Sequence, residues 1–310
     1  MERQFEPESL VVTMDTGDRL HYLDWGGPTT DRSPLPPLLL IHGLQATAWS
    51  WASLARRLRG STRVLAVDLR GHGLSESPRT GYDLESLAYD ALTVLSANGY
   101  GADVDGPPAV VAGHGLGAAV AVTMANLRPR SVAGLTLIEG GFEDLAEVTG
   151  MTAADYQRSI GDPPEVLASM AAYLADRREF DPPTWDADQE RAARAAVDEK
   201  HAGHVTSVVR AHALRGSVEA LFSYRPRVAL APVAAPVLIA IAESGAADDE
   251  TLRERRLALD DVVRARAAAG MAAPTIRIFK GAGHNLMRYR PDELGAALLE
   301  LLAQAVHQRS

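Results

Sequence analysis

The chain has 310 residues, a formal net charge of −9 and no cysteine. This length suffices for one large domain with a sizeable core, or for a domain that carries an insertion. The missing cysteines exclude disulfides, thiolate nucleophiles and cysteine-based metal sites. The acidic balance argues against a nucleic-acid surface, because such a surface needs clustered lysine and arginine.

The sequence shows no sign of export or of a membrane span. Residues 1–10 are polar and acidic, without the basic flank and apolar run of a signal peptide. No apolar run reaches the roughly 18 residues that a spanning helix needs. We therefore expect a cytoplasmic protein without a membrane partner, and the sequence leaves its oligomeric state open.

The first half of the chain alternates short apolar runs with helical segments. Residues 9–14 and 19–25 are strand-like and flank a turn at 15–18, which predicts a hairpin. Further strands are expected at 38–41, 64–67, 109–112 and 132–138, and helices at 51–59, 83–98 and 117–128. This alternation predicts an α/β fold, with a mostly parallel eight-stranded sheet and helices on both faces.

The alternation stops near residue 142 and resumes near 236. Residues 143–230 are rich in alanine and helical in pattern, without a convincing strand. Strands are then expected at 236–241 and 275–279, and helices at 249–269 and 291–307, the first of them a solvated, charged helix. The pattern predicts one core from residues 1–142 and 231–310, with 143–230 as a helical cap inserted between two core strands.

A glycine-rich turn between a predicted strand and helix is the most informative segment. Residues 110–119 read Val-Val-Ala-Gly-His-Gly-Leu-Gly-Ala-Ala. They resemble the nucleophile elbow of the α/β-hydrolase family, Gly-x-Ser-x-Gly. Gly113 and Gly117 match the flanking glycines, which let the strand and helix backbones approach closely. Gly115 stands where that family has its nucleophilic serine, and His114 takes the first variable position.

Three more segments resemble the same family, in the same order along the chain. They are residues 41–45 (Ile-His-Gly-Leu-Gln), 67–75 (Val-Asp-Leu-Arg-Gly-His-Gly-Leu-Ser) and 281–285 (Gly-Ala-Gly-His-Asn). The resemblance thus covers nearly the whole chain. It implies an oxyanion hole formed by the backbone N–H groups of Leu44 and Leu116, and a general base at His284.

The carboxylate that orients His284 has three candidates. The family most often places this acid after the strand that ends near residue 242, but Gly245 stands at the aligned position. Asp248 and Asp249, a few residues further on, are the first choice. Glu139, which follows the predicted strand 132–138, matches the location used by the haloalkane dehalogenase branch.

Other polar and aromatic residues are expected around the site. We expect His42, Gln45, His114 and Trp49 to line a substrate pocket, although Trp49 could equally well only pack a helix. The histidines at 201, 204 and 212 have helical spacing, but neither a third ligand nor a carboxylate is assured. We therefore expect no metal and no cofactor.

Three functions fit these features, each with a small-molecule substrate or ligand as partner. The first is a hydrolase of an ester, lactone or thioester whose nucleophile position holds Gly115. The second is an enzyme without a nucleophile, in which His284 activates water or abstracts a proton. The third is a binding protein that resembles the N-myc downstream-regulated proteins. The fold alone does not identify a substrate.

Overall fold

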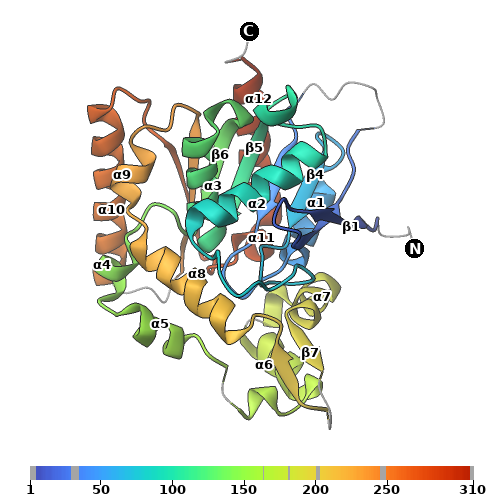
Figure 1. The fold of residues 1–310 in the computed structure, drawn as a ribbon. Coiled ribbons are helices and arrows are strands. Elements are labelled where there is room, and N and C mark those ends of the chain that lie inside the picture. Colours follow the sequence, from blue (N-terminus) through green and yellow to red (C-terminus); the bar gives the residue numbers. More distant parts are fainter. Residues whose placement is uncertain are drawn as a thin grey trace.

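A computed structural model describes residues 5–28, 35–162, 164–180, 182–199, 203–244 and 249–307; for residues 249–252 it describes only the backbone (Figure 1). The strands are β1 Glu8–Thr13, β2 Arg19–Asp24, β3 Leu38–Ile41, β4 Val64–Val67, β5 Ala109–His114, β6 Val132–Ile138, β7 Val197–Glu199, β8 Val205–Ser207, β9 Val237–Glu243 and β10 Thr275–Lys280. The helices are α1 Ala52–Leu58, α2 Leu84–Ala97, α3 Leu116–Leu127, α4 Leu145–Thr149, α5 Ala153–Ser159, α6 Met170–Phe180, α7 Ala187–Ala195, α8 Ala211–Ser223, α9 Pro226–Leu230, α10 Asp249–Ala268, α11 Leu286–Tyr289 and α12 Pro291–His307.

The main sheet has eight strands in the order β1-β2-β4-β3-β5-β6-β9-β10. β2 pairs antiparallel with β1 and with β4, and all other neighbours are parallel. The prediction of a mostly parallel eight-stranded sheet is confirmed. Because its central strands run the same way, the loops that follow β3, β5, β6 and β9 leave from one edge, where ligands bind in open parallel sheets.

The central strands are apolar on both faces because helices cover both. In β3, Leu39 and Ile41 belong to a core shared with α2 and α3. Leu38 and Leu40 point to the other face, into a core shared with α1 and α12. All four side chains are fully buried. Each such residue contributes about 1.5–3 kcal/mol through burial, so this short run holds both layers to the sheet.

The segment between β6 and β9 contains α4 to α9 and a small hairpin, and most of it lies at the lower end of the sheet in Figure 1. The expectation of a strand-free segment was wrong, because β7 and β8 pair antiparallel. Strands of three residues are too short for an alternating pattern to show in the sequence. Their buried residues Val197 and Val205 pack with Tyr173 of α6 in a separate apolar cluster.

Helix α7 of this segment is tied to the rest of the molecule through arginine side chains. Arg56 of α1 forms an ion pair with Asp188 of α7, and both side chains are mostly buried. One turn further along α7, Arg191 lies 4.2 Å from the centre of the Trp49 ring and pairs with Glu6. These contacts hold one face of α7 against the core.

Within the described residues, no helix is long and apolar enough to cross a membrane.

The Arg56–Asp188 ion pair should stabilise the fold measurably. Asp188→Ala leaves a buried guanidinium without its carboxylate, which should lower the free energy of unfolding by about 3 kcal/mol. The control is Glu190→Ala on the same helix, which removes a more exposed ion pair with Arg194 and should change stability by less than about 1 kcal/mol. Urea unfolding measures both; equal effects of the two substitutions would contradict the role of this pair.

Candidate active site

The turn between β5 and α3 consists of one residue, Gly115, with φ 52° and ψ −112°. A Cβ atom on Gly113 would lie 2.0 Å from the carbonyl oxygen of Gly117, and one on Gly117 would lie 2.2 Å from that of Ile41. A Cβ on Gly115 would meet only the Cα of Gly43, at 3.8 Å. The flanking glycines are therefore required by space. A side chain at 115 has room but needs a left-handed backbone.

Two backbone N–H groups meet at this turn. His42 Nδ1–H donates to the carbonyl oxygen of Gly43 at 2.7 Å, and His42 Nε2 accepts from Leu69 N–H at 3.1 Å. Since the two groups of a trans peptide point in opposite directions, the N–H of Leu44 points away from His42. Within the described residues, neither this N–H nor that of Leu116 donates a hydrogen bond. Both can therefore receive an anionic oxygen.

His284 and Glu139 form a hydrogen-bonded pair beside the turn. His284 lies between β10 and α11, and its Nδ1 is 3.2 Å from Glu139 Oε2. Glu139 follows β6, and its Oε1 accepts from the N–H of Ala242 at 2.6 Å and from Arg255 Nη2 at 2.9 Å. The Glu139 side chain is buried, whereas that of His284 is 61% exposed. With its Nδ1 proton donated to Glu139, His284 presents Nε2 as a base.

The surroundings keep Glu139 ionised. Burial acts to raise the pKa of this carboxyl, but the hydrogen bond from His284 and the positive charge of Arg255 outweigh burial and hold the pKa below its usual range. His114 has the opposite character, because burial lowers the pKa of its ring. Its Nε2–H donates to the carbonyl oxygen of His284 at 3.1 Å, which fixes the backbone of the loop.

Backbone strain gathers at the same place. Among the described residues, three that are not glycine have positive φ, and two of them are Gln45 at 59° and Glu139 at 51°. Both line the cavity that is described in the next paragraph. A Cβ atom on Gly140 would lie 2.7 Å from the Cα of Gly115, so the loop that carries Glu139 packs directly on the turn. Such strain persists only where the surrounding structure enforces it, and strained residues often gather at functional sites.

A cavity of ≈ 640 Å³ lies between this edge of the sheet and the segment from α4 to α8. One part of its wall is apolar and comes from α4, α5 and α8: Leu145, Val148, Tyr156 and Leu221. Another part is polar and comes from α6, α7 and α11: Tyr173, Arg177, Gln189 and Arg288. The volume suits a small organic molecule.

Most of the predicted site residues line this cavity: Gly115, His284, Glu139, Leu44, Leu116, Gln45 and His114. His42 and Trp49 are not among its lining residues. His42 is fully buried behind the Gly43 carbonyl, and Trp49 packs edge to face on Trp25.

The structure describes one of the three candidate acids in contact with His284, and it is Glu139. Asp248 and Gly245 lie outside the described residues, and Asp249 is described only as the first backbone residue of α10. His201 also lies outside them, while His212 Nε2 lies 2.9 Å from the carbonyl oxygen of Pro78. No group of three or more His, Asp or Glu among the described residues is placed to hold a metal ion.

The sequence reasoning missed Arg255 and Glu143. Helix α10 was expected to be a solvated face, and Arg253 and Arg256 are indeed exposed. The Arg255 side chain is only 16% exposed and bonds Glu139 and Glu143. A signal was available, because Arg255 shares a helical face with Leu259 and Val262, which pack in the core.

Comparisons with known proteins identify the family of the chain. A sequence profile described as the Alpha/beta hydrolase family matches residues 38–297. The chain belongs to this family. It is 32% identical over 143 residues to 2-(acetamidomethylene)succinate hydrolase of Mesorhizobium japonicum, which covers 46% of this chain and 49% of the relative. The chain therefore aligns with about half the length of that curated relative.

Solved structures resemble the chain over almost its whole length. The crystal structure of E-2-(acetamidomethylene)succinate hydrolase superposes with a TM-score of 0.75 at 22% identity, covering 96% of this chain and 99% of that one. A thioesterase domain from the curacin biosynthetic pathway gives 0.69 at 21% identity, covering 94% and 99%. At these identities the likeness shows the fold.

The three glycines of the turn should differ in their tolerance of a side chain. Gly117→Ala forces its Cβ into the backbone of Ile41 and should lower the free energy of unfolding by more than about 3 kcal/mol, or prevent folding. Gly115→Ala should lower it by only about 1–2 kcal/mol, for the left-handed backbone alone. Thermal and urea unfolding of the two variants give the comparison. A stable Gly117→Ala protein would show that the backbones are not so close.

Proposed function

We propose that this member of the alpha/beta hydrolase family hydrolyses a small ester, lactone or thioester, and that His284 and Glu139 act on water in place of a serine. The observation that carries the proposal is the hydrogen bond between His284 Nδ1 and Glu139 Oε2 in a chain with glycine at position 115. An oriented base next to two unbonded backbone N–H groups is the apparatus of acyl hydrolysis without its nucleophile.

The chemistry follows from the positions of these groups. A water molecule beside Gly115 gives a proton to His284 Nε2, and its oxygen attacks the carbonyl carbon of the substrate. The resulting oxyanion accepts hydrogen bonds from the N–H groups of Leu44 and Leu116. The tetrahedral intermediate collapses, the Nε2 proton moves to the leaving alcohol or thiol, and the acid remains. Glu139 stabilises the imidazolium throughout.

We further propose that residues 143–230 act as a cap on the core formed by residues 1–142 and 231–310. Side chains from α4 to α8 supply most of the cavity wall opposite the turn, so this segment sets the shape of the substrate. The names of the similar proteins, a hydrolase and a thioesterase, support cleavage of an acyl bond. The cavity of ≈ 640 Å³ supports a substrate of small-molecule size.

The assay is hydrolysis of p-nitrophenyl acetate by the unchanged protein and four variants: His284→Ala, Glu139→Gln, Gly115→Ser and Gly115→Ser with His284→Ala. The unchanged protein should be slow, and loss of the base should reduce its rate about 100-fold or more. Gly115→Ser should be faster and should show a transient acyl-enzyme mass at position 115, because the base and the oxyanion donors are then joined by a nucleophile.

The other outcomes point elsewhere. Activity that needs the serine and is missing from the unchanged protein would identify an inactivated serine hydrolase and overturn the water mechanism. Activity of the unchanged protein that survives His284→Ala would exclude His284 as the base. A folded set of variants without any activity would favour a binding role, or proton-transfer chemistry on another substrate.

A further inference from the structure

The guanidinium of Arg255 lies between two carboxylates at the cavity. Its Nη2 donates to Glu139 Oε1 at 2.9 Å, its Nε donates to Glu143 Oε1 at 2.9 Å, and its Nη1 donates to the carbonyl oxygen of Ala242 at 3.1 Å. All three charged side chains are mostly buried, with exposures of 16% for Arg255, 6% for Glu139 and 17% for Glu143. The planar fork of arginine can make these bonds together, which a lysine cannot.

We propose that Arg255 is a positioning residue for the Glu139–His284 pair, and that Glu143 sets how much of the Arg255 charge reaches Glu139. The consequence of this positioning for catalysis rests on the function proposed above. The contact itself can be tested without any turnover.

Glu139 needs such a residue because a glutamate side chain has three rotatable bonds. Two donors, the N–H of Ala242 and Nη2 of Arg255, hold Oε1 from different directions. With Oε1 fixed, Oε2 remains directed at His284 Nδ1. The backbone of Glu139 is itself left-handed, at φ 51°. The side chain is therefore held at both ends in one orientation.

Glu143 competes with Glu139 for the same cation. Burial raises the pKa of Glu143, although Arg255 opposes this effect. One guanidinium thus faces two carboxylates, and the cluster carries a net charge of about −1 when both are ionised. Of the described residues, the titratable groups that face Glu139 are Arg255 from α10, Glu143 from the loop before α4, and His284. The nearby His114 is held neutral by burial.

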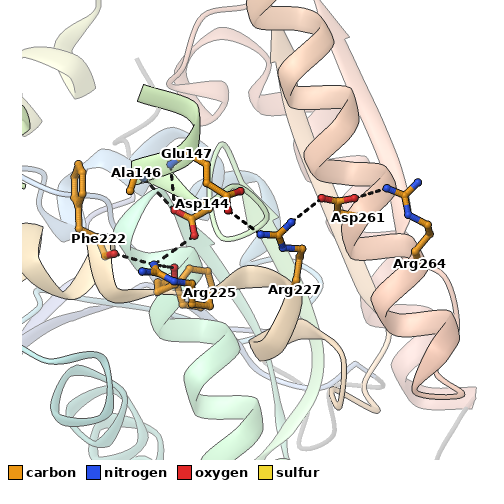
Figure 2. Close-up of polar contacts among 9 residues, drawn as sticks. Asp144, Ala146, Glu147, Phe222, Arg225, Arg227, Asp261 and Arg264 are labelled. Carbon is orange, nitrogen blue, oxygen red and sulfur yellow. Dashed lines mark hydrogen bonds and ion pairs between the residues drawn. The ribbon is translucent and has the colours of Figure 1, made fainter. Parts of the chain in front are cut away.

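A second ionic network links α4, α9 and α10, the helix that carries Arg255 (Figure 2). Arg227 of α9 pairs with Glu147 of α4 at 2.8 Å and with Asp261 of α10 at 3.1 Å. Asp144 caps α4 and pairs with Arg225 at 3.3 Å. Arg227 therefore links α10 to α4. On α10 the link is at Asp261, six residues after Arg255, and α4 begins just after Glu143. The helix that carries Arg255 therefore has polar contacts with α9, and through Arg227 with α4.

The readout is the His284 Nδ1–H proton in the NMR spectrum of ¹⁵N-histidine-labelled protein, assigned by its loss in His284→Gln. A hydrogen bond to an ionised carboxylate moves such a proton downfield, so the signal should disappear when acid protonates Glu139. The pH at which the signal disappears is called the acid edge below. Arg255→Met should weaken the signal and raise the acid edge by about one pH unit, because the nearby cation no longer lowers the pKa of Glu139.

Two further variants test the direction in which the acid edge moves, and they remain informative if Arg255→Met fails to fold. Glu143→Gln keeps the shape and gives Glu139 the whole cation, so the acid edge should move downward. Arg255→Lys keeps the charge and should restore most of the edge but not the full signal, since lysine lacks the fork. The control is Arg256→Met, the same charge change at the exposed neighbouring position, which should leave the spectrum unchanged.

The proposal is overturned if Arg255→Met gives the signal and acid edge of the unchanged protein, or if Arg256→Met shifts the edge equally. It is also overturned if Glu143→Gln leaves the edge in place and Arg255→Lys leaves the signal at full strength. A downfield His284 proton missing from the unchanged protein would refute the His284–Glu139 pair, and the proposed function with it. Failure at Arg255 alone leaves the proposed function standing.

Discussion

The close approach of three backbones at the turn after β5 is the constraint on which the site depends. The carbonyl oxygen of Ile41 occupies the space of a side chain on Gly117, so α3 begins in contact with the end of β3. Leu44 and Leu116, which lie next to this contact in the chain, both line the same cavity. Because backbone atoms make this arrangement, it persists whatever residue occupies position 115.

The buried carboxylate of Glu139 is stabilised by polar partners from several segments. The two cores on the faces of the sheet are built from apolar side chains, and the cavity edge buries a carboxylate next to a histidine. Burying a lone charge is strongly unfavourable. Glu139 is stabilised there by a backbone N–H, by His284 and by a cation from another helix. The acid of the site is thus a property of four segments, and no single loop defines it.

The segment between β6 and β9 contacts the core through apolar side chains and through ion pairs. Tyr224 and Leu230 pack in the core on one face of the sheet. Several other contacts run through arginine: Arg56 with Asp188, Arg191 with Glu6, and Arg227 with Asp261. The last two pairs are partly exposed, and exposed pairs are weakened by salt. The core carries His284, Glu139 and the glycine turn, and this segment supplies another part of the cavity wall. Such a division lets one fold host different binding sites.

Sequence patterns alone predicted the sheet and the glycine turn, and they predicted that His284 lies in a loop beside that turn. Apolar runs of four to seven residues and glycines two positions apart encode local structure, and the order of motifs placed Gly115, Leu44 and His284. The fold, in contrast, shows which of the described carboxylates contacts His284, namely Glu139. Spacing could not predict this contact over Asp248 or Asp249, because it depends on β6 lying next to β9 and on Arg255, 116 residues away. The sequence also did not predict the cavity walls or the β7–β8 hairpin, since packing between distant segments leaves little periodic pattern in a sequence.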